Sequence, residues 1–299
     1  MSTARPSASD TGLEAFDRHR RLLFTVAYQM LGSVADAEDT VQDAWLRWSS
    51  ADRSDVTDPK AYLVRITSRL ALDRLGAART RRETYVGPWL PEPLLTEDVA
   101  AGPEESAELG EQVSLALLVV LETLSPVERA VFVLREVFGM PVAEVAAALG
   151  RSEAAVRQQA HRAREHVQAR RPRFETDRRT QREVTERFVA AAAGGDVEAL
   201  VALLAPDVVL VSDGGGRASA ALRPITGVDK VTQFLLATAA TGLQLPGLEI
   251  EVTDVNGVPG LVVRTEGQPF LVMSLAVADG RVEQVFVVRN PDKLAGLRR

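Results

Sequence analysis

The hydrophobic pattern of this 299-residue chain changes once along its length, and that change limits the folds it can adopt. Up to about Arg182, apolar residues recur at intervals of three and four, which predicts amphipathic helices. From Val184 onward, two short helices are followed by β-branched runs, with hairpin turns at Val255-Asn256-Gly257 and Ala278-Asp279-Gly280-Arg281. The sequence therefore predicts helical domains followed by an α+β domain with an antiparallel sheet.

A proline-rich acidic segment divides the helical part in two. Glu83 to Gln112 holds four prolines and eight acidic residues but no basic residue, a composition typical of an extended linker. The expected organisation is a helical segment at 13–82, a linker at 83–112, a second helical segment at 113–171 and the α+β domain at 180–299.

Composition excludes several classes of protein. The chain has no cysteine, so disulfide scaffolds, zinc ribbons, iron–sulfur clusters and cysteine nucleophiles are excluded, and we expect no metal and no cofactor. The first ten residues lack an apolar core, and the longest uncharged stretch, Val231 to Leu248, is interrupted by Gln, Gly and Pro. We therefore expect no signal peptide and no membrane span, and we expect a cytoplasmic protein.

The formal charge of -6 conceals two arginine clusters. Arg65 to Arg82 holds six arginines against Asp73 alone, and Arg151 to Arg182 holds ten arginines against four acids. Clustered arginine in an acidic protein favours a polyanionic partner. At this point a solvated helix face explains the clusters equally well.

The second cluster lies on a predicted helix-turn-helix. Pro141–Leu149 and Glu153–Glu165 form two short helices around the turn Gly150-Arg151-Ser152. In the second helix, spacings of four, three and four predict a buried stripe of Val156, Ala160, Ala163 and Val167. The outward face then carries side chains that contact bases and phosphates, namely Arg157, Gln158, His161, Arg162 and Arg164. A generic two-helix corner with a solvated face is the alternative.

An acidic ridge is predicted near the start of the chain. Asp36, Asp39 and Asp43 are spaced i, i+3 and i+7, which places them on one helix face that suits a basic partner helix. The helix dipole alone would explain Asp36 and Asp39, but it would not explain Asp43.

These segments resemble the extracytoplasmic-function (ECF) group of bacterial sigma factors. The stretch from Leu124 to Glu136, together with Pro141 to Gly150 and Val156 to Glu165, resembles their region four. The stretches from Asp36 to Leu46 and from Ala61 to Asp73 resemble their region two.

The resemblance implies partners for each set of residues. Core RNA polymerase would be bound by region two at the β′ clamp helices, through Asp36, Asp39, Gln42 and Asp43, and by region four at the β flap. Promoter DNA at the −10 element would be contacted by Arg65, Arg69, Arg74, Arg79, Arg81 and Arg82. The outward face of the helix-turn-helix, from Arg157 to Arg164, would bind the −35 element.

Three short signatures resemble a subgroup of these factors with a fused SnoaL-like C-terminal domain. They are Trp89-Leu90-Pro91-Glu92-Pro93, Asp213-Gly214-Gly215-Gly216 followed by Arg217, and Asn290-Pro291-Asp292-Lys293-Leu294. The subgroup usually has Lys at the position of Arg217. The resemblance implies two all-α sigma domains followed by an α+β, NTF2-like cone that regulates them in cis, without a separate membrane anti-sigma factor.

The signatures predict where the regulatory contact lies. A large ring between prolines gains free energy by leaving water, so we expect Trp89, Leu90 and Pro91 to pack near Asp213–Arg217, with Asn290–Leu294 close by. Packing of Trp89 on region two or region four is the alternative.

We expect no catalytic residue in the C-terminal domain, although some SnoaL-like relatives are enzymes. The three histidines are His19, His161 and His166, so none lies between residues 183 and 299, and the alternation around Glu249 and Glu251 points both acids outward. Three alternatives stay open: a SnoaL-type enzyme tethered to a DNA-binding module, a repressor that uses the helix-turn-helix alone, and a small-molecule ligand in the C-terminal pocket. The glycine-rich loop after Asp213 is at least as consistent with a flexible turn.

Overall fold

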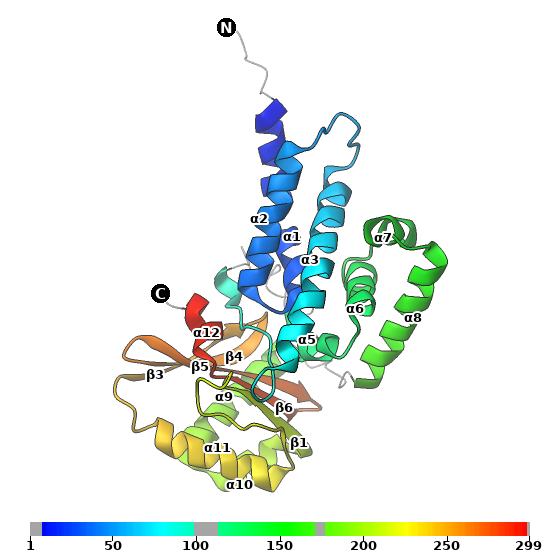
Figure 1. The fold of residues 1–299 in the computed structure, drawn as a ribbon. Helices are drawn as coiled ribbons and strands as arrows, with labels where there is room; N and C mark the ends of the chain where they lie inside the picture. The colour runs from blue at the N-terminus through cyan, green and yellow to red at the C-terminus, as the bar shows by residue number, and fades with distance from the viewer. Residues whose placement is uncertain (1–7, 99–112, 171–176, 298–299) are drawn as a thin grey trace. The chain divides into compact units, whose positions relative to one another are not determined.

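The computed structural model describes residues 8–98, 113–170 and 177–297, which belong to two compact units (Figure 1). One unit combines Met1–Arg81 with Val120–Ala169, and the other combines Arg82–Val119 with Arg170–Arg299. The first contains the predicted helical segment at 13–82 up to Arg81 and the predicted segment at 113–171 from Val120 to Ala169, while residues 113–119 belong to the second unit. The second contains the α+β domain together with the described parts of the linker and the residues up to Val119.

The first unit is built from helices, as the sequence predicts. Its elements are α1 (Ala8–Leu31), α2 (Val34–Ser50), α3 (Pro59–Glu83), α6 (Pro126–Phe132), the π-helical turn η2 (Val133–Val137), α7 (Val142–Leu149) and α8 (Glu153–Arg170). A further helix, α5 (Leu115–Glu122), crosses the boundary between the two units.

Side-chain caps fix the starts of these helices. Ser33 accepts a hydrogen bond from the backbone N–H of Asp36 and begins α2. Ser125 and Glu128 form a reciprocal capping box at α6, with Pro126 at the first helical position. Each cap satisfies backbone donors that lack a partner inside the helix.

The second unit is an α+β fold around one six-stranded sheet. Its helices are α9 (Arg178–Gly194), α10 (Val197–Leu203), α11 (Val228–Gly242) and α12 (Pro291–Leu294), with short 3₁₀ turns at Thr96–Asp98 and Ala295–Leu297. Its strands are β1 (Leu204–Asp213), β2 (Ile225–Thr226), β3 (Leu248–Val255), β4 (Val258–Thr265), β5 (Gln268–Ala278) and β6 (Arg281–Val288). The strand order is β2-β1-β6-β5-β4-β3.

Two features of this unit differ from the sequence-based expectation. The sheet is mixed, because β1 and β6 pair in parallel with Asp213 opposite Val288, while every other neighbouring pair is antiparallel. Helix α11 was also not expected, since Gly227 at its N-cap provides no capping side chain. Both predicted hairpins, β3–β4 and β5–β6, are present.

The two faces of the sheet are covered by different parts of the unit. Helices α9, α10 and α11 pack on one face, where Val208 and Leu210 of β1 point (Figure 1). Alternate strand residues point the other way. There they form a second core with linker residues, α5 and the C-terminal turn, whose members include Leu90, Leu95, Leu115, Val272, Phe286, Leu294 and Leu297. The linker is therefore a structural layer of this unit.

Within the described part of the chain, no helix is long and apolar enough to cross a bilayer. Among the same residues, no group of three His, Cys, Asp or Glu side chains is placed to hold a metal ion.

Candidate nucleic-acid interface and linker site

The helix-turn-helix forms as its pattern predicts. Gly150 adopts a left-handed φ of 63° and ends α7, and α8 begins after Ser152. The whole predicted stripe is buried, with exposed fractions of 6% or less at Val156, Ala160, Ala163 and Val167. The turn and the stripe together fix which face of α8 points outward.

The outward face of α8 carries all five predicted DNA-binding side chains in exposed positions, namely Arg157, Gln158, His161, Arg162 and Arg164. Arg157 pairs with Glu153 on the same helix, and Arg164 donates to Glu136 at 2.7 Å. Exposed ion pairs of this kind contribute little stability. These arginines can therefore exchange a carboxylate for a phosphate at little cost.

The predicted acidic ridge lies on α2, but its members differ in exposure. Asp39 and Gln42 are exposed, while Asp36 and Asp43 are half-buried. Asp43 accepts a hydrogen bond from Arg74 at 2.8 Å. Asp39 is thus the most accessible acid of the ridge, and Asp43 also holds α3 against α2.

The arginines of α3 lie in different surroundings. Arg65 stacks on Tyr62 at 4.8 Å, and Arg74 also donates to the Thr40 hydroxyl at 2.5 Å. Arg69 is exposed but donates to the carbonyl oxygens of Ala147 and Ala148, at 2.9 and 2.7 Å. The side chains of Arg79 and Arg81 lie outside what the structure describes.

A second arginine joins the same two helical segments. Arg129 is 2% exposed and donates to the Met30 carbonyl at 2.9 Å, to the Leu121 carbonyl at 2.9 Å and to Glu122 at 2.6 Å. Met30 lies in the last turn of α1, as Ala147 and Ala148 lie in the last turn of α7. Each segment therefore supplies an arginine that satisfies unpaired carbonyls at a helix end of the other. Sequence analysis did not identify Arg129, because an arginine in a helix gives no signal of a distant carbonyl partner.

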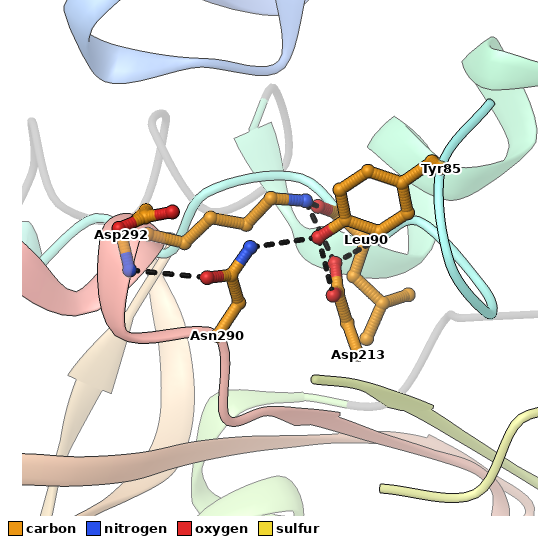
Figure 2. A network of polar contacts seen from close by, with 6 residues as sticks. Tyr85, Leu90, Asp213, Asn290 and Asp292 are labelled. Atoms are coloured by element: carbon orange, nitrogen blue, oxygen red, sulfur yellow. Dashed lines mark hydrogen bonds and ion pairs between the residues drawn. The ribbon is translucent and has the colours of Figure 1, made fainter. Parts of the chain in front are cut away.

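The three signature segments meet at Asp213, at the end of β1 (Figure 2). Its carboxylate is fully buried. It accepts hydrogen bonds from the Tyr85 hydroxyl at 2.6 Å, from the Leu90 backbone N–H at 2.8 Å and from the Lys293 ammonium at 2.7 Å. The contact expected between the linker and the C-terminal domain is thus present in the structure, with Tyr85 as an additional member.

Lys293 bonds to both the linker and Asp213. Its ammonium donates to the Leu90 carbonyl and lies 4.0 Å from the Trp89 ring centroid, while the Arg82 guanidinium lies 3.6 Å from the same ring. Burial lowers the pKa of Lys293 to about 8, although the nearby Asp213 carboxylate raises it. Arg82, expected at DNA, is engaged with the linker in this structure.

Asn290 and the glycine-rich loop complete the network (Figure 2). The Asn290 side-chain amide donates to the Tyr85 hydroxyl at 2.8 Å, and its side-chain oxygen caps α12 by accepting from the Asp292 N–H at 3.0 Å. A Cβ on Gly215 would lie 2.3 Å from the Asn290 side-chain nitrogen, so the close approach requires glycine. Exposed Arg217 pairs with Asp292 at 2.9 Å.

The remaining signature residues frame these contacts. Pro291 opens α12, Leu294 is 2% exposed in the second core, and Pro91 is buried beside Leu90. Gly214 approaches the Ala218 carbonyl so closely that a Cβ would lie 2.2 Å from it. Burial raises the pKa of the Tyr85 hydroxyl, and the hydrogen bond to Asp213 raises it further.

A second contact point for the linker was missed by sequence analysis. Asn256 is fully buried with a left-handed φ of 53°, and its side-chain oxygen accepts from the Leu94 N–H at 3.1 Å. Its own N–H donates to the Leu94 carbonyl at 2.7 Å, and its side-chain amide donates to the Val113 carbonyl at 3.0 Å. The sequence identified Asn256 only as a hairpin turn. We call Asp213, Asn256, Gly257, Asn290 and Lys293 the linker site.

The helix-turn-helix, the acidic helix and the arginine-bearing α3, joined to an α+β domain, define a multi-domain transcription factor. Family models match the chain in the same order: Sigma-70 region 2 at residues 15–81, Sigma-70 region 4 at 114–167 and a SnoaL-like domain at 185–288.

Relatives extend the match to nearly the whole chain. The chain is 42% identical to the ECF RNA polymerase sigma factor SigJ of Mycobacterium tuberculosis, over 94% of this chain and 92% of that protein. It is 32% identical to a probable ECF sigma factor, SigI, of the same species, over 98% of each. The crystal structure of SigJ matches with a TM-score of 0.77 and 40% identity, covering 95% of this chain and 98% of that one. The chain belongs to the ECF sigma factors of RNA polymerase, proteins that direct promoter-specific transcription initiation.

Gly215→Ala should destabilise the second unit more than Gly267→Ala. Both glycines have positive φ, 58° and 73°, so both substitutions carry a backbone strain of roughly 1–2 kcal/mol. Only at position 215 would the new Cβ also strike Asn290 and Tyr85, since nothing lies within 4 Å of position 267. We expect thermal unfolding followed by circular dichroism to give a Tm roughly 3–5 °C lower for Gly215→Ala. Equal Tm values for the two variants would contradict this assignment.

Proposed function

We propose that this sigma factor is controlled in cis by its SnoaL-like domain, through docking of the linker at Asp213 and Lys293. Core polymerase is bound through the exposed acidic face of α2, centred on Asp39. The −35 element is bound by the outward face of α8, and the −10 element by the arginines of α3. The observation that carries the proposal is the linker site, where the buried Asp213 carboxylate and the largely buried Lys293 ammonium bond to the main chain of Leu90.

The distance between the two promoter elements gives the physical reason for control by linker docking. Elements at −10 and −35 lie about 25 base pairs apart, which is roughly 85 Å of B-form DNA. A free linker of 30 residues, from 83 to 112, could span about 100 Å when extended. Docking removes most of that reach, because Tyr85 to Thr96 and Val113 to Val119 are then held on one domain. A docked linker therefore restricts the separation of the two DNA-binding regions.

The hydrogen bonds of Arg69 and Arg129 also restrict the separation of the two DNA-binding regions. Regions two and four are each bodies roughly 30 Å across, and Arg69 and Arg129 join them through hydrogen bonds of 2.7–2.9 Å. Regions held in this way cannot occupy both elements of one promoter. Arg69 must also leave Ala147 and Ala148 before it can contact DNA, so promoter binding competes with the closed arrangement.

A regulatory role for the C-terminal domain is favoured over a catalytic one. The polar cluster at Asp213 and Lys293 is filled by the peptide unit of Leu90, whose side chain is 1% exposed. Acid–base catalysis would need these groups to face a substrate.

Lys293→Gln should raise promoter-directed transcription several-fold. The substitution removes the cation that bonds to Asp213 and to the Leu90 carbonyl, and loss of one member of a buried ion pair costs about 3–5 kcal/mol. The matched control is Lys230→Gln, which removes an exposed lysine of α11 and should leave transcription unchanged. Transcription reconstituted with core polymerase measures the effect. Unchanged transcription by a folded Lys293→Gln variant would refute cis control at this site.

Asp39→Lys should weaken binding to core polymerase by about tenfold or more without changing Tm. Asp39 is exposed, and reversing an exposed charge usually changes stability by less than about 0.5 kcal/mol. Asp55→Lys, the same reversal on the loop before α3, is the control. Fluorescence anisotropy of the labelled factor against core polymerase tests this, and equal affinities for the two variants would remove α2 from the interface.

Arg162→Ala should reduce promoter-directed transcription but leave core binding unchanged. Arg162 is exposed on the outward face of α8, and a lost base contact costs about 1–3 kcal/mol, or roughly 5- to 150-fold in DNA affinity. Arg47→Ala, an exposed arginine of α2, is the control. Transcription at the level of the parent protein would show that α8 does not contact the promoter.

A further inference from the structure

We propose that the linker site is a binding site for extended peptides, and that a peptide from another molecule can occupy it in place of the linker. The ligand is an extended segment with an aromatic residue, a leucine and a proline in succession, followed by further aliphatic residues. The regulatory consequence rests on the cis control proposed above, whereas the binding itself does not.

The first argument is that the site contacts main-chain groups at Leu90. Asp213 accepts the Leu90 N–H at 2.8 Å, and Lys293 donates to the carbonyl of the same residue. A buried carboxylate and a largely buried ammonium thus bond to the N–H and the carbonyl of a single residue. Every peptide presents these groups, so this recognition does not depend on the linker's own sequence.

The same main-chain pattern recurs four residues later. Asn256 accepts the Leu94 N–H at 3.1 Å and donates its own N–H to the Leu94 carbonyl at 2.7 Å. Next to it, Leu95 forms an antiparallel bridge with Val255, and the Gly257 N–H donates to the Thr96 hydroxyl at 2.8 Å. The bound segment is therefore held at two points along its backbone, as in strand addition to a sheet.

Side chains define the class of peptide. Leu90, Leu94 and Leu95 are 1%, 7% and 3% exposed, and Leu90 and Leu95 belong to the second core with strand residues of the sheet. The Trp89 ring lies against the Lys293 ammonium at 4.0 Å. Aliphatic positions and an aromatic ring beside a cation favour an extended ligand that contains Trp-Leu-Pro followed by further aliphatic residues.

The linker supplies several of the hydrogen bonds made at the linker site. Tyr85 and Leu90 supply two of the donors to Asp213, so departure of the linker leaves a buried carboxylate with Lys293 as its partner within the domain. Asn256 would lose the Leu94 N–H and carbonyl at the same time. A second peptide would restore the same main-chain hydrogen bonds, which favours its binding when the linker leaves.

The linker is covalently attached to the domain, and this attachment determines which variant can reveal peptide binding. A linker attached in cis has an effective concentration in the millimolar range, so a peptide in trans competes poorly with the intact linker. The experiment therefore uses the full-length chain with Trp89→Ala and Leu90→Ala, which weaken the linker and leave the domain's own groups unchanged. The probe is a labelled peptide of residues 84–98, acetylated and amidated at its ends, and binding is measured by fluorescence anisotropy.

We expect the peptide to bind this variant at least tenfold more tightly than it binds the parent chain. The same peptide N-methylated at the Leu90 amide lacks only the N–H that Asp213 accepts, and it should bind roughly tenfold more weakly or worse. The control peptide carries Val86→Ala, at a position that is 53% exposed, and should bind like the parent peptide. If the double variant does not fold, Trp89→Ala alone replaces it.

The outcomes separate this proposal from cis control. Equal binding of the N-methylated and parent peptides overturns main-chain recognition, and no binding to a folded released-linker variant overturns the proposal. If the peptide does not bind but that variant transcribes more than the parent chain, cis control stands without a peptide site. If the peptide binds and transcription is unchanged, the peptide site stands and cis control falls.

Discussion

The buried carboxylate of Asp213 is the constraint on which the second unit depends. A charge removed from water needs several hydrogen bonds, and Asp213 obtains them from Tyr85, Leu90 and Lys293. Two of these three donors belong to the linker rather than to the SnoaL-like domain. Lys293 of the domain supplies one of these hydrogen bonds, and the bound linker supplies the other two. This dependence makes the linker a layer of the fold.

Regions two and four show a related arrangement with arginines. Arg129 bonds to a carbonyl in the last turn of α1, and Arg69 bonds to carbonyls in the last turn of α7. The two residues differ in burial, since Arg129 is 2% exposed and Arg69 is exposed. Arg129 is therefore shielded from solvent and holds the two regions together. Arg69 is open to solvent, so its guanidinium could exchange the two carbonyl oxygens for phosphates. A residue predicted to contact DNA thus also joins region two to region four.

The sequence predicted what short-range spacing encodes. The stripe from Val156 to Val167 is buried, and the turn at Gly150 separates α7 from α8, because each depends on neighbours within a few residues. The parallel pairing of β1 with β6 was not predictable, since β-branched runs do not specify which strand lies beside which. For the same reason Arg129 and Asn256 were missed: their partners, Met30 and Leu94, lie far away in the chain. The contact of Leu90 and Lys293 with Asp213 could be anticipated from the signatures, whereas Tyr85 as a further donor could not.

Linker docking and polymerase affinity are coupled under the proposed control. If core polymerase binds only the open form, its apparent dissociation constant equals the intrinsic one divided by the open fraction. Each 1.4 kcal/mol of docking energy then weakens apparent binding about tenfold. A contact containing a buried ion pair and two main-chain anchor points can supply several times that amount. By reciprocity, polymerase weakens docking by the same factor, so a peptide that replaces the linker would raise polymerase affinity without touching the polymerase.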